Sequence, residues 1–137
     1  MNATTATTIT DTAVVRSVFG AFASGDLAAL SDLLHASATW HHHNDDRLGG
    51  IHRGAEAIIA YLTESALLSA GTLHAEPQSV MADGEGHVAV LVRLRANRPD
   101  GRTMDGPQVV LVTVQGSRVR AIEQFVGDPA AVATFWA

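Results

Sequence analysis

The chain has 137 residues, of which 47% are hydrophobic and 17% charged, so it is long enough for one domain with a buried core. It contains no cysteine, which excludes disulfides, thiolate nucleophiles and cysteine-based metal sites. All 9 basic residues are arginine, so no lysine can form a Schiff base or serve a P-loop. The 14 acidic residues give a net charge of −5, which argues against a nucleic-acid-binding surface.

Residues 1–10 are rich in threonine and alanine and have neither a basic start nor an apolar stretch of signal-peptide length. We expect a disordered tail there, followed by one domain over residues 11–137. The longest apolar runs, such as residues 109–112, are too short to cross a bilayer. We therefore expect a cytoplasmic protein with no membrane partner.

Helical spacing of apolar residues marks the first third of the chain. It predicts a helix over residues 12–23, with Asp11 as its N-cap and Gly25 at its end. Asp26 can then cap a short second helix over residues 27–34.

A strand over residues 38–43, a polar loop over 44–50 and a third helix over 54–69 follow. The apolar period then changes to two, with turn sequences between the alternating segments. This pattern predicts successive strands over residues 73–82, 87–97, 103–115 and 118–126. Residues 129–136 can form a short closing helix.

Helices followed by a long antiparallel meander are typical of the α+β class. Helices laid on one face of a strongly curved sheet would enclose a cavity. The opposite face also carries apolar residues, while Arg93 and Arg95 point outward by strand parity and suit a surface or an interface. We therefore expect a homodimer that packs sheet to sheet.

Several local patterns occur in a characteristic order. They are Phe22–Leu27 at the first helix end, Ala38–His41 in the first strand, Gly50–Gly54 before the third helix, and Val114–Val119 leading to Phe125–Asp128. Over about residues 12–136 this order resembles the SnoaL-like and ketosteroid-isomerase-like families of the nuclear transport factor 2-like superfamily. The resemblance implies a cone-shaped α+β domain, in which a strongly curved, mixed and largely antiparallel sheet and three helices of the N-terminal half enclose an apolar pocket.

Strand parity puts Trp40 and His42 on one face of their strand, and the resemblance turns that face inward. The expected pocket then has apolar walls with a few polar groups, the usual composition of a small-molecule site. The expected wall and substrate-binding residues are Val18, Trp40, Leu73, Val90, Val92, Leu94, Val110, Val112 and Ile122. The expected polar groups are His42, Tyr61, Gln108 and Gln124, with Asp128 near the mouth.

His42 is the candidate proton carrier, since an imidazole gains and loses a proton near neutral pH. The resemblance places it about where ketosteroid isomerases carry their general-base aspartate. Tyr61 or a glutamine could donate a hydrogen bond to a substrate carbonyl. Alternatively, the Tyr61 ring fills the core, and each glutamine bonds to a water or to another side chain. Asp128 could act as an acid or could cap the closing helix.

The chain departs from the catalytic sets of the families that it resembles. Ketosteroid isomerases hold an oxyanion with a tyrosine and an aspartic acid; the tyrosine position is Val18 here, and the aspartic acid position falls near Val110. SnoaL-like cyclases use an aspartate on the last strand; the nearest inward position here is Gln124, and an amide cannot exchange a proton at ordinary pH. The interior strand positions that match the Asp-Arg-Asp set of limonene epoxide hydrolases are apolar here.

Consecutive histidines at 41–43 also raise the question of a metal site. Only His41 and His43 share a strand face, in a His-x-His spacing that His52 could complete. Because the run continues into a polar loop over Asp45 and Asp46, we interpret it as solvated and expect no native metal.

The sequence favours a cofactor-free enzyme that acts on a small, apolar, carbonyl-bearing metabolite, as a cyclase, isomerase or dehydratase with proton transfer at His42. The proposed catalytic residues are His42, Tyr61, Gln124 and Asp128. The missing carboxylates keep a second hypothesis open, a non-catalytic module that binds a small molecule. A third is a domain that serves only in dimerisation, because this superfamily hosts many functions.

Overall fold

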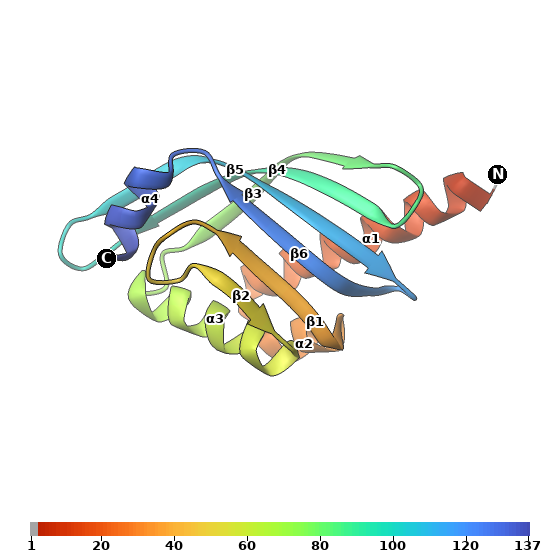
Figure 1. Cartoon of the computed structure of the whole chain (residues 1–137), viewed down its shortest axis with the longest axis horizontal. Helices are drawn as coiled ribbons and strands as arrows, with labels where there is room; N and C mark the ends of the chain where they lie inside the picture. The colour runs from red at the N-terminus through yellow and green to blue at the C-terminus, as the bar shows by residue number, and fades with distance from the viewer. Residues whose placement is uncertain (1–2) are drawn as a thin grey trace.

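The structure, a computed structural model, describes residues 3–137. Its helices are α1 (Ala3–Ser24), α2 (Leu27–Asp32), α3 (Ala55–Leu68) and α4 (Pro129–Trp136) (Figure 1). Its strands are β1 (Leu34–His43), β2 (Gly50–Arg53), β3 (His74–Ala82), β4 (His87–Asn97), β5 (Thr103–Gln115) and β6 (Arg118–Val126). Among the described residues, no helix is both long and apolar enough to cross a membrane.

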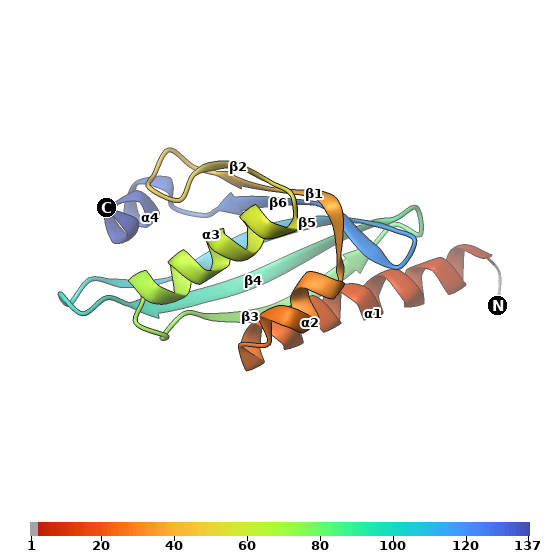
Figure 2. The ribbon, with the colours of Figure 1, turned by 90° about the horizontal axis from the view of Figure 1, so that it is seen from below.

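The strands form one mixed sheet in the order β2-β1-β6-β5-β4-β3. Only the pair β1 and β6 is parallel; the other neighbours are antiparallel. Helix α3 packs on β1 and β2, and α1 packs mainly on β3 and β4. All three helices of the N-terminal half lie on the same side of the bent sheet (Figure 2). The expected α+β class and mixed, largely antiparallel sheet are confirmed.

The inner face of the sheet forms the core. Val88, Val90 and Val92 alternate along β4 with more exposed residues, and each is at most 2% exposed. On the outer face, four large hydrophobic side chains remain exposed, namely Ile51, Met81, Val109 and Phe125. The period-2 pattern therefore gave the correct inward set, and it leaves an apolar outer surface.

The first helix is longer than the expected 12–23. It begins at Ala3, so the tail expected over residues 1–10 is helical from Ala3 onward, and residues 1–2 lie outside the described range. Alanine favours helix, and extending a formed helix costs far less than starting one. Asp11 lies inside this helix with a buried side chain and so does not cap it.

The region of β1 and β2 also differs from the expectation. Strand β1 begins at Leu34, which the helical pattern had assigned to the second helix, and β2 had been interpreted as the approach to the third helix. β2 has only 4 residues between two glycines, too few to show alternation.

The boundaries of β4, β5, β6 and α4 agree with the sequence prediction, because turn residues mark those segments. Asp26 caps α2 as expected, accepting a bond from the Ala29 N–H at 3.0 Å.

Candidate functional site

A cavity lies between the inner face of the sheet and the helices. Its polar lining includes Trp40, His42, Tyr61, Gln108 and Gln124, from β1, α3, β5 and β6. Its apolar lining includes Val18, Phe19, Phe22, Leu30, Leu62, Leu73, Ala75, Val92, Leu94, Val110, Val112, Ile122 and Trp136. Of the expected wall residues only Val90 is absent; it is fully buried in the core. Strand parity fixes the face of a residue but not its depth along the strand.

His42 stands at the polar end of this cavity with only 1% of its surface exposed. Its Nε2 lies 2.9 Å from Oδ2 of Asp46, and its Nδ1 lies 2.9 Å from the hydroxyl of Tyr61. Both ring nitrogens are therefore engaged by polar groups, which is what a buried imidazole requires.

Asp46 comes from the loop between β1 and β2, and its side chain is 0% exposed. Besides His42, the amide of Asn44 donates to Oδ2 at 2.7 Å, and the backbone N–H of Leu48 donates to Oδ1 at 2.8 Å. The Asn44 amide and the Leu48 N–H thus donate to the two carboxyl oxygens, so this buried side chain has the hydrogen bonds that a carboxylate requires. The expectation that Asp46 is a solvated loop residue is therefore wrong.

The loop holds this carboxylate because it is tightly closed. A Cβ added at Gly49 would overlap the carbonyl oxygen of Asn44, so only glycine allows this close approach of the backbone. Asn44 also donates to the carbonyl of Pro129 at 3.1 Å, which ties the loop to the start of α4.

The two glutamines continue the network on the other side of Tyr61. The indole Nε1–H of Trp40 lies 2.9 Å from Oε1 of Gln124, and because indole can only donate, that atom must be the amide oxygen. Nε2 of Gln124 then donates to Oε1 of Gln108 at 2.6 Å. With this assignment, the NH₂ group of Gln108 has no acceptor among the described residues. Gln108 lies at the cavity wall.

The hydrogen bonds that join His42, Tyr61 and Gln124 can rearrange when the imidazole gains a proton. A carboxylate only accepts, so Nε2 of His42 carries a hydrogen and Nδ1 keeps a lone pair when the ring is neutral. The single hydrogen of Tyr61 has two acceptors, Nδ1 of His42 at 2.9 Å and Oε1 of Gln124 at 2.8 Å. When Nδ1 gains a proton, the Tyr61 hydrogen can turn to Gln124. The site can therefore take up a proton without moving a heavy atom.

Tyr61 itself is held as a neutral phenol. Burial raises the pKa of its hydroxyl well above the usual range, and the negative charge of Asp46 raises it further, while the bond to Gln124 opposes the shift. His52 stacks on the Tyr61 ring with centroids 4.2 Å apart and bonds to the Leu48 carbonyl at 3.0 Å. His52 thus faces inward from β2 and does not join His41 and His43.

Asp128 is not brought to this network. It is exposed, lines no part of the cavity with His42, and accepts a bond from the Ala131 N–H at 3.2 Å as the N-cap of α4. Its position before Pro129 already pointed to that role. Sequence reasoning missed the partnership of Asp46 and the cavity contact of Trp136; the spacing of His42 and Asp46 across a short loop was the one available signal.

Comparisons with known proteins agree with this geometry. In the solved structure of Bal32a from a soil-derived mobile gene cassette, 28% of residues are identical, with a TM-score of 0.92 over 96% of this chain and 99% of that one. An NTF2-like protein from Burkholderia xenovorans LB400 has 25% identity and a TM-score of 0.81, over 95% and 98%. The structure of TerC co-crystallised with polyporic acid has 18% identity and a TM-score of 0.80, over 92% and 97%. The fold is therefore that of the nuclear transport factor 2-like class.

Sequence comparison identifies the family within that class. An uncharacterized protein of Mycobacterium tuberculosis is 35% identical over 127 residues, which cover 93% of this chain and 96% of the relative. The family model described as the SnoaL-like domain matches residues 15–122. The chain belongs to the SnoaL-like domain family.

Proposed function

We propose that the chain is a cofactor-free enzyme of the SnoaL-like type, in which His42 moves a proton on a small, largely apolar, carbonyl-bearing molecule. The reaction would be a cyclisation, an isomerisation or a dehydration. The observation that carries the proposal is an imidazole bonded to a buried carboxylate at the wall of an apolar cavity. The TerC structure, co-crystallised with polyporic acid, supports binding of a small molecule by this fold.

His42 would serve as the general base through Nδ1. The Asp46 carboxylate 2.9 Å from Nε2 fixes the tautomer and stabilises the imidazolium that forms. Because Tyr61 lies between Nδ1 and Gln124, its hydroxyl can relay the proton: the oxygen takes one hydrogen from the substrate as its own hydrogen passes to Nδ1. The raised pKa of Tyr61 suits this relay, since the phenol never persists as an anion.

Removing a proton beside a carbonyl puts negative charge on the carbonyl oxygen. Gln108 lines the cavity, and its NH₂ group, which has no acceptor among the described residues, would stabilise that charge as a preorganised donor. Gln124 would act by positioning Tyr61 and Gln108 rather than by proton exchange, because an amide does not titrate.

The test measures exchange of the hydrogens next to the carbonyl in a panel of cyclic and aromatic ketones, followed by NMR in D₂O. A ketone that fits the cavity should exchange faster with the protein than without it. His42→Gln and Asp46→Asn should lower the catalysed rate by about 10²–10⁴-fold, the usual contribution of a general base. His87→Gln, which alters an exposed histidine elsewhere, should leave the rate unchanged. Undiminished exchange in folded His42→Gln would refute the assignment of His42.

A non-catalytic binding module remains the second candidate, and one observation favours it. At positions 108 and 124 the cavity wall carries amides bonded to each other, and an amide does not exchange a proton at ordinary pH. Native mass spectrometry of the purified protein would detect a bound metabolite. A ligand recovered unchanged after long incubation would support binding alone.

We also keep two wider proposals: a homodimer formed through the outer sheet face, and a cytoplasmic location. The exposed Ile51, Met81, Val109 and Phe125 on that face support the dimer.

A further inference from the structure

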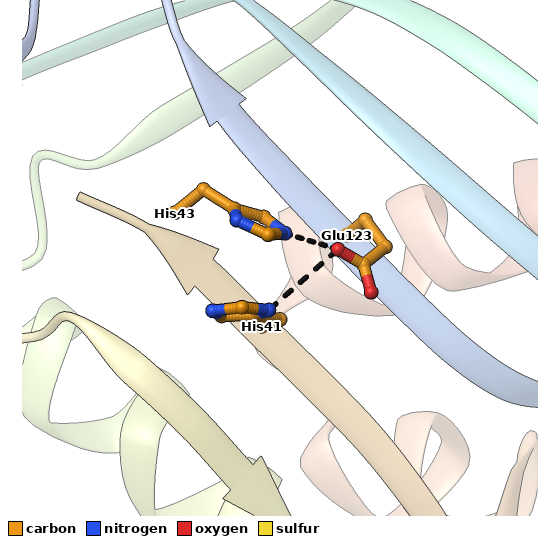
Figure 3. A group of neighbouring side chains, drawn as sticks. All are labelled: His41, His43 and Glu123. Atoms are coloured by element: carbon orange, nitrogen blue, oxygen red, sulfur yellow. Dashed lines mark hydrogen bonds and ion pairs between the residues drawn. The ribbon is translucent and has the colours of Figure 1, made fainter.

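The outer face of β1 carries a second group of titratable side chains, separate from the cavity. His41 and His43 alternate with His42, so both project to the face opposite the cavity. In the parallel register of β1 and β6, His41 lies beside Glu123 and His43 beside Phe125. The sheet therefore brings two imidazoles and one carboxylate together from neighbouring strands (Figure 3).

The three side chains converge on one carboxylate oxygen. Nε2 of His43 bonds directly to Oε2 of Glu123, and Nδ1 of His41 lies 3.7 Å from the same oxygen. The two imidazole rings face each other with centroids 3.5 Å apart. One ligand atom from each of the three residues lies within 4.8 Å of the others.

We propose that His41, His43 and Glu123 bind a divalent transition-metal ion of the zinc type. Two imidazole nitrogens and one carboxylate oxygen are a ligand set that such ions prefer, and three protein ligands leave a fourth position for water. Tetrahedral ligands about 2.0–2.1 Å from a zinc ion lie about 3.3 Å from one another. The 3.7 Å separation of His41 and Glu123 is close to that value, and the ion would replace the proton that now joins His43 to Glu123.

The surroundings hold the ligands in place. The Phe125 ring stacks on His43 with centroids 4.5 Å apart and planes 9° apart, which restricts rotation of that imidazole. Ile51 pairs with His41 on the other side and is 46% exposed, so an apolar margin borders the ligands. In the single chain the side chains of the three ligands are 31–39% exposed, so an ion can reach them from the outer face of the sheet. The expectation of no metal from the sequence omitted Glu123, which lies 80 residues after His43.

Isothermal calorimetry with Zn²⁺ on the chelator-treated chain, without any appended histidine tag, tests the proposal. We expect one zinc ion per chain, with affinity at least tenfold lower in each of His41→Ala, His43→Ala and Glu123→Gln. His87→Ala is the matched control, because His87 also contacts a carboxylate, Asp83 at 2.7 Å, but has no third ligand among the described residues. That variant should bind zinc as the parent chain does.

Absence of saturable zinc binding would overturn the proposal, and so would binding that all three variants retain. Loss of binding in the His87→Ala control would also overturn it, because the zinc would then sit elsewhere. The substituted side chains are partly exposed, so circular dichroism should show each variant folded.

Discussion

Tyr61 is the residue on which both halves of the buried network depend. Its hydroxyl bonds to the histidine that faces Asp46 and to the amide that faces Trp40. No other described side chain bridges these two groups. The Tyr61 hydrogen can point to His42 when the imidazole is neutral, and it turns to Gln124 when Nδ1 carries a proton.

Replacing Tyr61 with phenylalanine removes only this hydroxyl. His42 Nδ1 would lose its partner while staying buried, so we expect the free energy of unfolding to fall by about 1–3 kcal/mol. Ketone exchange should fall as well, since the relay is broken. Urea denaturation and the NMR exchange assay measure the two effects.

Trp40→Phe is the matched control for that variant. It removes another donor to the same Gln124 oxygen but leaves the pairing of Tyr61 and His42 intact. We expect exchange to be reduced less than in Tyr61→Phe. Equal loss in both variants would contradict the relay through Tyr61.

The positions of these residues could be predicted from the sequence only in part. Alternation along the strands grouped residues by face, and the family resemblance turned the face with Trp40, His42, Gln108 and Gln124 inward. It could not reveal Asp46, because a loop residue has no periodicity and its burial depends on how tightly the loop closes. The composition around it, Asn-Asp-Asp-Arg, is typical of solvated turns.

Among the secondary-structure elements, the loop between β1 and β2 contributes most directly to the site. Glycine at position 49 allows the backbone to lie close to the Asn44 carbonyl. The loop thereby holds Asp46 within hydrogen-bond distance of His42.

In Gly49→Ala the added methyl group would push the loop away from Asn44. We expect lower thermal stability and a loss of ketone exchange comparable to that of Asp46→Asn, because the carboxylate would withdraw from His42. Gly20→Ala, at an open helical position, should instead be neutral or slightly stabilising. Unchanged exchange in Gly49→Ala would show that the loop does not need this geometry.

The turn between β4 and β5 has a comparable role for α4. Arg98 donates to the carbonyls of Phe135 and Ala137, and Arg102 to that of Thr134. These cations sit at the helix C-terminus, where the dipole favours them. Asp100 in turn receives a bond from Arg102 at 2.7 Å, and the turn thereby supports the helix that places Trp136 at the cavity.

The pairing of Asp100 with Arg102 should make the stability of the protein depend on pH in the acid range. Hydrogen bonds from Arg102 lower the pKa of the Asp100 carboxyl to about 2, below its ordinary 3.8. A lowered folded-state pKa stabilises the protein above the ordinary value, and that stability is lost as the pH falls toward 2. Asp100→Asn should therefore be less stable than the parent chain near neutral pH, with a difference that shrinks between about pH 4 and pH 2. Thermal unfolding across that range measures it; a constant difference would contradict the pairing.

The bounds of helices and strands were predicted correctly where characteristic turn residues separate them. The prediction failed where such residues are absent. Strands β4 to β6 are separated by Gly-containing turns, and their ends were assigned correctly. The first helix was started too late because the Thr/Ala segment carries no amphipathic pattern, although it continues a helix that packing stabilises. Strand β2 exists because it pairs with β1, a tertiary cause that a short segment does not display.

At the scale of the whole molecule, the sheet presents two different faces. The inner face meets the helices and the cavity, whereas the outer face combines exposed apolar side chains with the proposed ion site. The strands carry apolar residues on both faces, but the helices cover only the inner one. A partner chain would bury what the helices do not cover.

If the outer face forms a homodimer, a charge placed at its apolar centre should prevent association. Val109 and Phe125 pair across β5 and β6 and are 40% and 42% exposed. Val109→Asp should shift the protein to monomers in sedimentation experiments while its circular dichroism stays native. Leu67→Asp, at a 75% exposed position on α3, should leave the mass unchanged. A monomeric parent chain would contradict the dimer.

The central claim is that a buried carboxylate fixes the tautomer of His42 and leaves Nδ1 available as a base. Long-range ¹H–¹⁵N NMR of the imidazole at neutral pH tests this most directly, because nitrogens with and without hydrogen have distinct shifts. We predict that Nε2 carries the hydrogen and that Nδ1 has the shift of an acceptor. A hydrogen on Nδ1 with a bare Nε2 would contradict the account.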